Sequence, residues 1–210
     1  MFAAIVLGAA ALGLLVSLVV PSHTADAWSG PLVMATAVLV ASGAAKVLAP
    51  TAASDALGAL GAPAGLPLVR TLGVGEVILG VAAVLAGGPV LAAGVSFTYL
   101  AFAVVAWRMS RSSDVRSCGC FGASGARPGL THVVVDVATA LLAGGAAAAG
   151  SGGAIALVSD SPAWGIPALA GSALGAAAAI ALLTVAADTA AAVDGPRPAP
   201  TTFHLVDESR

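Results

Sequence analysis

The chain contains only two cysteines, and they stand two positions apart as Cys118-Gly119-Cys120. A disulfide between them would close a small, strained ring, and the intervening glycine permits the unusual backbone torsions that such a ring needs. Strained, exposed disulfides have high reduction potentials and exchange readily with thiols. The nearby Arg116 and Arg127 would stabilise a thiolate. The spacing therefore favours a catalytic or relay pair of cysteines over a structural crosslink.

Two other interpretations of the cysteines stay open. A closed zinc site needs four ligands, and Cys118 and Cys120 have only His132 and Asp136 nearby, without the paired spacing typical of zinc sites. We therefore predict no metal centre. The second alternative is a pair of reduced thiols without a chemical role. No cofactor motif is evident, and a quinone is the one cofactor for which the intramembrane polar residues offer a site.

Three ionisable residues, Lys46, Glu76 and Asp136, lie inside long apolar stretches, where each charge costs at least about 2.5 to 3.5 kcal/mol. Helical side chains lean toward the helix N-terminus, so Lys46 leans toward mid-membrane and Glu76 back toward the start of its own span. We expect the two to meet, either as an ion pair that fixes helix docking or as a proton or quinone-headgroup site. His132 precedes Asp136 by one helical turn, which fits a helix start near the interface or a part of that site.

The composition explains why these residues sit in apolar surroundings. Of 210 residues, 59% are hydrophobic and 9% are charged, whereas a soluble domain is about a quarter charged. Most of the exterior must therefore face a lipid bilayer. A net charge of −2 without a basic block excludes nucleic-acid binding. The apolar residues are mostly Ala, Val and Leu in long runs, which predicts an all-α polytopic transmembrane bundle instead of a β-barrel.

Six stretches are long enough to span a bilayer, which needs about 20 apolar residues. The predicted spans are 2–20, 32–49, 68–86, 89–107, 131–149 and 166–187. The turn Gly87-Gly88-Pro89 predicts that the third and fourth spans form a close hairpin. The other breaks, including 50–67 and 150–165, are read as loops rich in Pro, Gly and Ser.

The spans divide the chain into four parts. Residues 1–30 hold the first span and an outer loop, although Ala25-Asp26-Ala27 also resembles the cleavage site of a signal peptide. Residues 31–149 form the membrane core, and residues 150–187 add a loop and an extra span. Residues 188–210 are polar and rich in proline, which predicts a disordered tail.

All basic residues fall on one side of the membrane when the spans are laid out. Because basic loops stay in the cytoplasm, we predict a multi-pass protein of the cell membrane with both termini and the Cys118/Cys120 loop in the cytoplasm. Disulfides, however, form mainly outside the cytoplasm. Either the pair works with cytosolic reductants and passes electrons across, or the charge rule fails here. The residues concerned are Lys46, Arg70, Arg108, Arg111, Arg116, Arg127, Arg197 and Arg210.

The string Cys118-Gly119-Cys120-Phe121-Gly122 resembles the CGCFG motif of the MauE branch of the MauE/DoxX membrane proteins. The segment Ser42-Gly43-Ala44-Ala45-Lys46-Val47-Leu48 resembles that family's helix end of small residues followed by lysine. Leu72-Gly73-Val74-Gly75-Glu76 resembles its next helix, which carries a glutamate. The resemblance covers about 31–149 and implies a four-helix DoxX-like core with additional helices around it.

The resemblance implies a role in methylamine utilisation, in the maturation or transport of the disulfide-rich light subunit of methylamine dehydrogenase beside a thioredoxin-like partner. His132 and Asp136 depart from the family, whose members tend to carry an arginine in that helix, and the sixth span exceeds the family core. We therefore predict thiol–disulfide redox or maturation of a disulfide-containing partner, and leave open whether the chain is itself an oxidoreductase. The alternatives are a small transporter that uses Glu76 and Asp136 as proton-coupling carboxylates, and a non-catalytic membrane assembly scaffold.

Overall fold

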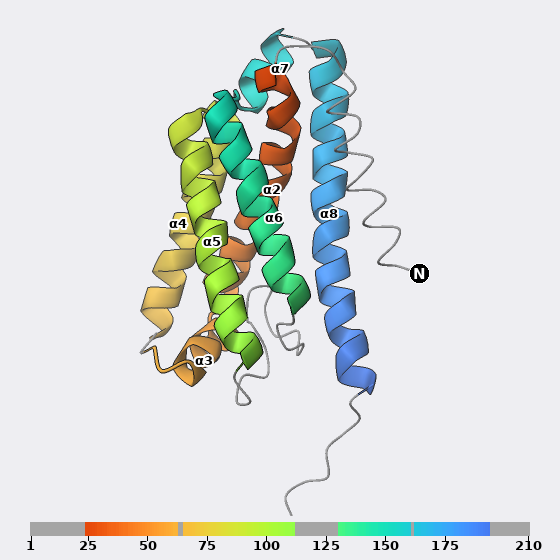
Figure 1. The fold of residues 1–210 in the computed structure, drawn as a ribbon. Helices are drawn as coiled ribbons and strands as arrows, with labels where there is room; N and C mark the ends of the chain where they lie inside the picture. The colour runs from red at the N-terminus through yellow and green to blue at the C-terminus, as the bar shows by residue number, and fades with distance from the viewer. Residues whose placement is uncertain (1–23, 63–64, 112–129, 161, 194–210) are drawn as a thin grey trace, which may run out of the picture.

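The structure is a computed structural model that describes residues 24–62, 65–111, 130–160 and 162–193. Within these residues the chain forms helices joined by short connections, with one isolated bridge between Gly87 and Gly152, which confirms the all-α prediction (Figure 1). The helices of this part are α2 (Thr24–Leu48), α3 (Thr51–Ala59), α4 (Leu66–Ala86), α5 (Pro89–Arg111), α6 (Leu130–Ala149), α7 (Ala154–Asp160) and α8 (Pro162–Val193).

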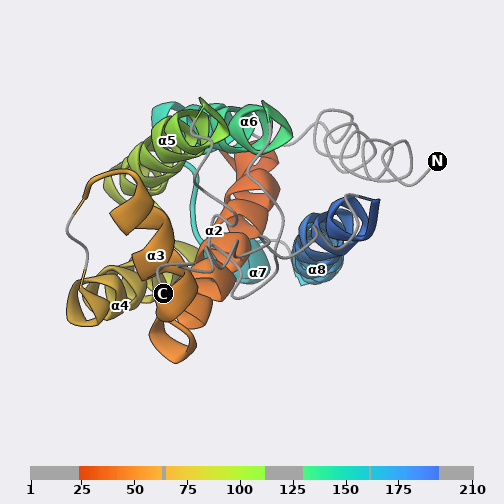
Figure 2. The same ribbon diagram turned by 90° about the horizontal axis from the view of Figure 1, so that it is seen from below.

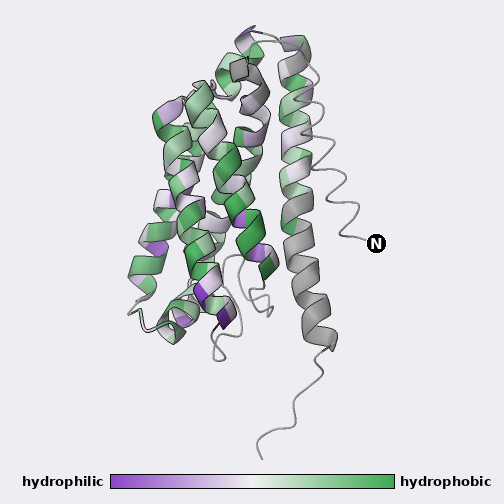
Figure 3. Cartoon of the chain, viewed as in Figure 1, coloured by the Kyte–Doolittle hydropathy of each residue, from purple (hydrophilic) through white to green (hydrophobic). Residues whose placement is uncertain are grey.

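Among the described residues, four helices are long and apolar enough to cross a membrane. These stretches are Trp28–Leu48, Leu66–Ala86, Pro89–Arg111 and Leu130–Ala149, and they match the second to fifth predicted spans. The first predicted span, 2–20, lies outside the described residues. The sixth falls within α8, whose described apolar part is Gly165–Ala177. Large hydrophobic side chains are exposed on α4, α5 and α6, as a surface in contact with lipid requires, and hydrophobic residues are frequent along these helices (Figure 3).

Helix α2 is the centre of the bundle. It contacts α4, α5, α6, α7 and α8, and these helices surround it when the molecule is viewed along its long axis (Figure 2). Successive long helices run in opposite directions. Helix α4 packs chiefly on α2, whereas α5 packs chiefly on α6. The turn between α4 and α5 is as tight as predicted, with positive φ at Gly87 and Gly88, but the two helices diverge from it because each fits a different neighbour better.

The sequence predicts loops at 50–67 and 150–165, but each of these stretches contains a short helix, α3 in the first and α7 in the second. In α3, buried Ala56 packs with Leu60 against Met109 and Val105 at the end of α5. These contacts supply the apolar burial that favours a helix there, and they let α3 cover one end of the bundle. Helix α7 covers the opposite end (Figure 1).

The end of the bundle near α7 is held by hydrogen bonds to backbone carbonyl oxygens of the α6–α7 connection. The Gly88 N–H donates to the Ser151 carbonyl oxygen at 2.9 Å, and the Ser29 hydroxyl donates to the Gly152 carbonyl oxygen at 3.1 Å. The Gly87 position has no space for a side chain, because a Cβ there would lie within 2.3 Å of Gly152 and Gly153 backbone atoms. The α4–α5 turn, the α6–α7 connection and α2 therefore meet at this end.

Helices α2 and α4 pack closely against each other. The buried residues of α4 alternate at spacings of four and three, as in the seam of a left-handed helix pair: Val69, Gly73, Glu76, Gly80 and Ala83. A Cβ on Gly43 would lie 2.6 Å from the Gly73 carbonyl oxygen, and a Cβ on Gly73 would lie 2.6 Å from that of Gly43. The two backbones therefore touch directly, as small residues allow in membrane helices.

This contact predicts that Gly73→Ala lowers the free energy of unfolding by about 1–3 kcal/mol, because the added methyl group meets backbone that cannot rotate away. Gly75→Ala is the matched control, since a Cβ on Gly75 meets nothing within 4 Å. It should be neutral or slightly stabilising, because alanine favours a helix by about 0.5–1 kcal/mol. Chemical unfolding of both variants in one detergent measures the difference, and equal stabilities would contradict the close contact.

Candidate functional site

The structure brings Lys46 of α2 and Glu76 of α4 together, as their opposite leans along antiparallel helices predict. The Lys46 Nζ lies 2.7 Å from the Glu76 Oε2, and both side chains are about nine-tenths buried, with exposed fractions of 10% and 9%. Taking two charges out of water is costly unless each finds its partner and its hydrogen bonds. The pair therefore forms the core of the candidate site.

Two further groups surround the Lys46 ammonium. Its Nζ donates to the Ser42 hydroxyl oxygen at 2.7 Å, one turn earlier on α2. It also lies 4.8 Å from the centre of the Phe102 ring of α5, a cation–π distance. Phe102 in turn meets the Tyr99 ring edge-on, with the ring centres 5.8 Å apart. Lys46 thus joins three helices through a carboxylate, a hydroxyl and an aromatic face.

The glycines of the α2–α4 contact explain how the charged side chains fit. Gly43 precedes Lys46 by three residues, and Gly73 precedes Glu76 by three residues, so each helix carries a glycine and a charge on one face. A Cβ on Gly43 would lie 2.9 Å from the Glu76 Cβ, and one on Gly73 would lie 2.9 Å from the Lys46 Cβ. Each glycine therefore leaves room for the charged residue of the opposite helix.

Tyr99 joins α5 to α2 beside the ion pair. Its buried hydroxyl donates to the Ala35 carbonyl oxygen of α2 at 2.7 Å. We call Ser42, Lys46, Glu76 and Tyr99 the polar cluster. Each of the helices α2, α4 and α5 contributes at least one member to it.

The other predicted site residues lie on α6 or outside the described residues. Asp136 is half-buried on α6 and precedes the buried Ala140 by one turn, so it continues the face that packs into the bundle. His132 is also half-buried and lies one turn closer to the start of α6. Cys118 and Cys120 lie outside the described residues. Within the part that the structure describes, no three His, Cys, Asp or Glu side chains are grouped as a metal site would need.

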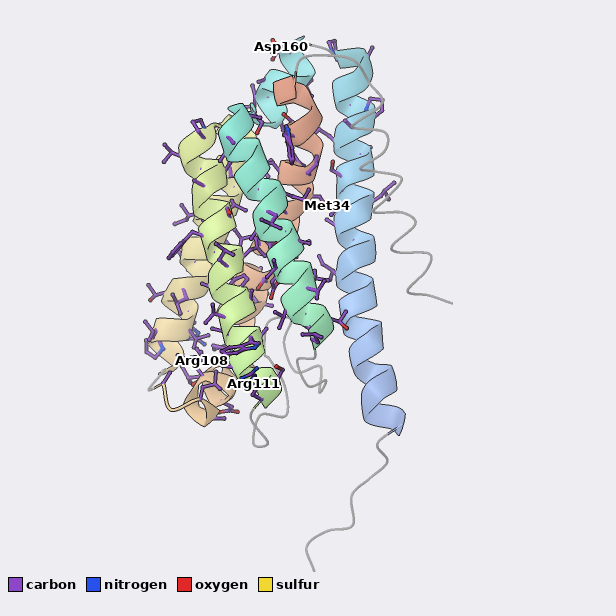
Figure 4. All side chains as sticks on the ribbon, in the orientation of Figure 1. Met34, Arg108, Arg111 and Asp160 are labelled. Atoms are coloured by element: carbon purple, nitrogen blue, oxygen red, sulfur yellow. The ribbon has the colours of Figure 1, made fainter. Side chains whose placement is uncertain are left out.

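The charged residues are distributed unequally along the bundle. Lys46, Arg70, Arg108 and Arg111 all belong to the half that contains α3, whereas Asp160 marks the opposite end (Figure 4). Residues 112–129, which hold the cysteines, join the end of α5 to the start of α6 at the same end as these arginines. The polar cluster and both attachments of the cysteine segment therefore share one half of the molecule.

A family model described as methylamine utilisation protein MauE matches residues 23–150. This chain belongs to the MauE family. The matched range begins just before α2 and ends with α6, so it contains the polar cluster and the string Cys118–Gly122, and α7 and α8 lie beyond it. No curated protein and no solved structure matches the chain. The wider link to DoxX-like proteins stays a prediction.

Three residues that complete the site in this MauE-family protein were not identified from the sequence as site residues. Ser42 carried a usable signal, because a hydroxyl one turn before a buried lysine lies on the same helix face. Tyr99 is the only tyrosine in the chain and lies near the middle of a span, where its hydroxyl needs a partner. Phe102 carried no signal, because only the crossing of α2 and α5 places its ring over Lys46.

Because Lys46 and Glu76 compensate each other's charge, each residue should stabilise the fold only when the other is present. Lys46→Met or Glu76→Gln alone should lower the free energy of unfolding by about 3 kcal/mol, because each leaves a buried polar group without its charged partner. The double variant should lose less than the sum, since it removes both charges. Unfolding of the four forms in one detergent gives the coupling energy.

Arg70→Gln is the control for the ion-pair cycle. It removes an exposed cation from the same helix as Glu76 and should change the stability by less than about 0.5 kcal/mol. Strictly additive losses in the Lys46/Glu76 double variant would show that the two side chains do not stabilise each other.

Proposed function

We propose that this MauE-family membrane protein exchanges thiols and disulfides with a thioredoxin-like partner, and thereby serves the maturation of a disulfide-containing protein in methylamine utilisation. The observation that carries the proposal is the string Cys118-Gly119-Cys120-Phe121-Gly122 within the range matched by the family. Family membership supports the pathway, and the cysteine spacing supports the chemistry.

The position of the cysteine segment supports this chemistry. Arg108 and Arg111 lie in the last turn of α5, directly before the segment, and Arg116 and Arg127 lie inside it. Positive charge near a thiol favours the thiolate, which is the attacking form. The described helices on either side of the segment, α5 before it and α6 after it, meet it at the same end of the bundle.

The proposed exchange proceeds in two balanced steps. One thiolate of the pair attacks a disulfide of the partner, which breaks the partner's S–S bond, forms a mixed disulfide and releases one partner thiolate. The second thiolate of the pair then attacks the mixed disulfide, closes the Cys118–Cys120 disulfide and releases the other partner thiolate. Two electrons pass to the partner, whose thiolates take up the two protons that the pair gave up. A second dithiol of thioredoxin type returns the pair to its reduced form.

The polar cluster has a structural part in this proposal. It fixes α2, α4 and α5 against one another through Lys46 and Tyr99 in the half of the bundle that carries the cysteine segment. The cluster thereby provides a rigid base for thiol chemistry. Because both charges of the ion pair are already compensated, this arrangement supports a positioning role better than solute transport.

We further propose that this half faces the cytoplasm, because the basic residues collect there. Ser110 and Ser159 are exposed at opposite ends of the bundle and provide the test. In the Cys118→Ser, Cys120→Ser background, a membrane-impermeant maleimide should label Ser159→Cys in intact cells and Ser110→Cys only after permeabilisation. The reverse pattern would invert the orientation and place the native cysteines outside.

Trapping the mixed disulfide tests the chemistry. With Cys120→Ser or Cys118→Ser, one of the two variants should accumulate a mixed disulfide with a thioredoxin-like protein, because the resolving thiol is missing. Non-reducing gels of the purified membrane fraction, followed by mass spectrometry of the released partner, identify the adduct. The native pair should titrate between dithiol and disulfide at a potential more oxidising than about −270 mV, the thioredoxin value.

The control for trapping carries a lone cysteine at the same end of the bundle. Ser110→Cys in the Cys118→Ser, Cys120→Ser background offers a thiol outside the Cys-Gly-Cys string and should trap no partner. Equal trapping by this control would mean that any accessible thiol suffices. Full methylamine-dependent growth of the variant without cysteines would also contradict the proposal.

A further inference from the structure

One face of α5 is turned away from the bundle along its whole second half. Phe97, Leu100, Val104, Trp107 and Arg111 follow one another at spacings of three and four residues, so they form a single stripe. The apolar members are exposed, from 73% for Phe97 to 43% for Trp107. The buried residues of α5 occupy its other side. We call these five residues the α5 stripe.

The α5 stripe has the dimensions of one leaflet of a bilayer. At about 1.5 Å per residue, Phe97 and Trp107 are about 15 Å apart along the helix, which is half of the roughly 30 Å hydrocarbon core. Arg111 lies about 6 Å beyond Trp107, at the depth of the headgroup layer. Trp107 therefore lies at the boundary where tryptophan is enriched in membrane proteins.

The basic end of the stripe is preorganised. The Arg111 guanidinium carbon lies 4.2 Å from the centre of the Trp107 ring, a stacked arrangement that fixes the plane of the guanidinium. Arg108 lies one turn before Arg111 and is also exposed, at the same end of the bundle (Figure 4). Among the described residues, neither arginine forms an ion pair with a carboxylate. No described side chain or backbone group occupies their hydrogen-bond donors, which can therefore bind an external anion.

We propose that the α5 stripe binds an anionic phospholipid, with an acyl chain along Phe97, Leu100 and Val104 and the headgroup phosphodiester held by Arg108 and Arg111. Arginine suits this anion because its planar fork can donate two parallel hydrogen bonds to phosphate oxygens. The apolar part of the stripe favours a lipid over an acidic soluble protein, since only a lipid occupies both the hydrocarbon and the headgroup depth. Arg108 and Arg111 also precede the cysteine segment, but lipid retention is measured without any thiol exchange, so failure of the lipid site leaves the proposed thiol chemistry untouched.

The test uses the full chain in nanodiscs of phosphatidylcholine that contain a minor fraction of phosphatidylglycerol. After extraction into detergent, native mass spectrometry should find phosphatidylglycerol retained in preference to phosphatidylcholine. Arg111→Gln should reduce this preference about fivefold, the effect of one basic side chain near an anionic surface. Arg70→Gln is the matched control, because it removes one exposed cation at the same end but from α4, and it should leave the preference nearly unchanged.

A second readout places the lipid on the stripe. Phosphatidylglycerol brominated in its acyl chains should quench the Trp107 fluorescence more than equally brominated phosphatidylcholine, with Trp107→Phe giving the background from the other tryptophans. Equal losses in Arg111→Gln and Arg70→Gln would overturn the site in favour of a diffuse surface potential. Displacement of the retained lipid by soluble glycerophosphoglycerol, the phosphodiester without acyl chains, would show that a free phosphodiester suffices and would overturn the assignment to a membrane lipid.

Discussion

The direct backbone contact between α2 and α4 is the constraint on which the remaining site depends. Because Gly43 and Gly73 carry no side chains, the helices approach closely enough for the Lys46 Nζ and the Glu76 Oε2 to meet at 2.7 Å. A charge inside the membrane is costly unless it is paired or reaches the interface. Lys46 also lies over the Phe102 ring, which links α5 to the ion pair. The close packing of Gly43 against Gly73 and the pairing of the buried charges of Lys46 and Glu76 therefore depend on each other.

The bundle is held differently at its two ends. Near α7, the Gly88 N–H of the α4–α5 turn and the Ser29 hydroxyl of α2 both donate to backbone carbonyl oxygens of the α6–α7 connection. In the other half, side chains hold the helices together: the ion pair, the Tyr99 hydroxyl and the apolar contact of α3 with α5. A single substitution can change a side-chain contact, whereas the backbone carbonyl groups of the α6–α7 connection are present whatever the side chain. The half that carries the cysteine segment is thus the one whose geometry single substitutions can adjust.

The sequence predicted the four central spans and the Lys46–Glu76 contact, because span length and the direction of helical side chains are local properties. It missed α3, whose helix depends on burial against Met109 of α5, and it overstated the α4–α5 hairpin, since a tight turn does not determine which neighbour each helix prefers. Phe102 shows the same limit, because its role depends on where α2 and α5 cross. Such pairings are set by complementary surfaces far apart in the chain.

The separation of the paired residues in the chain also imposes an order on biosynthesis. Lys46 precedes Glu76 by 30 residues, so at about 5–20 residues per second the lysine is made roughly 1.5–6 seconds before its partner. During that interval α2 carries a cation with no carboxylate to meet it. Lys46 lies in the last turn of α2, from which its long side chain can extend to the membrane surface and remain hydrated. A lysine in the middle of the span could not reach the membrane surface. The position of Lys46 near the helix end therefore allows α2 to enter the bilayer before the ion pair exists.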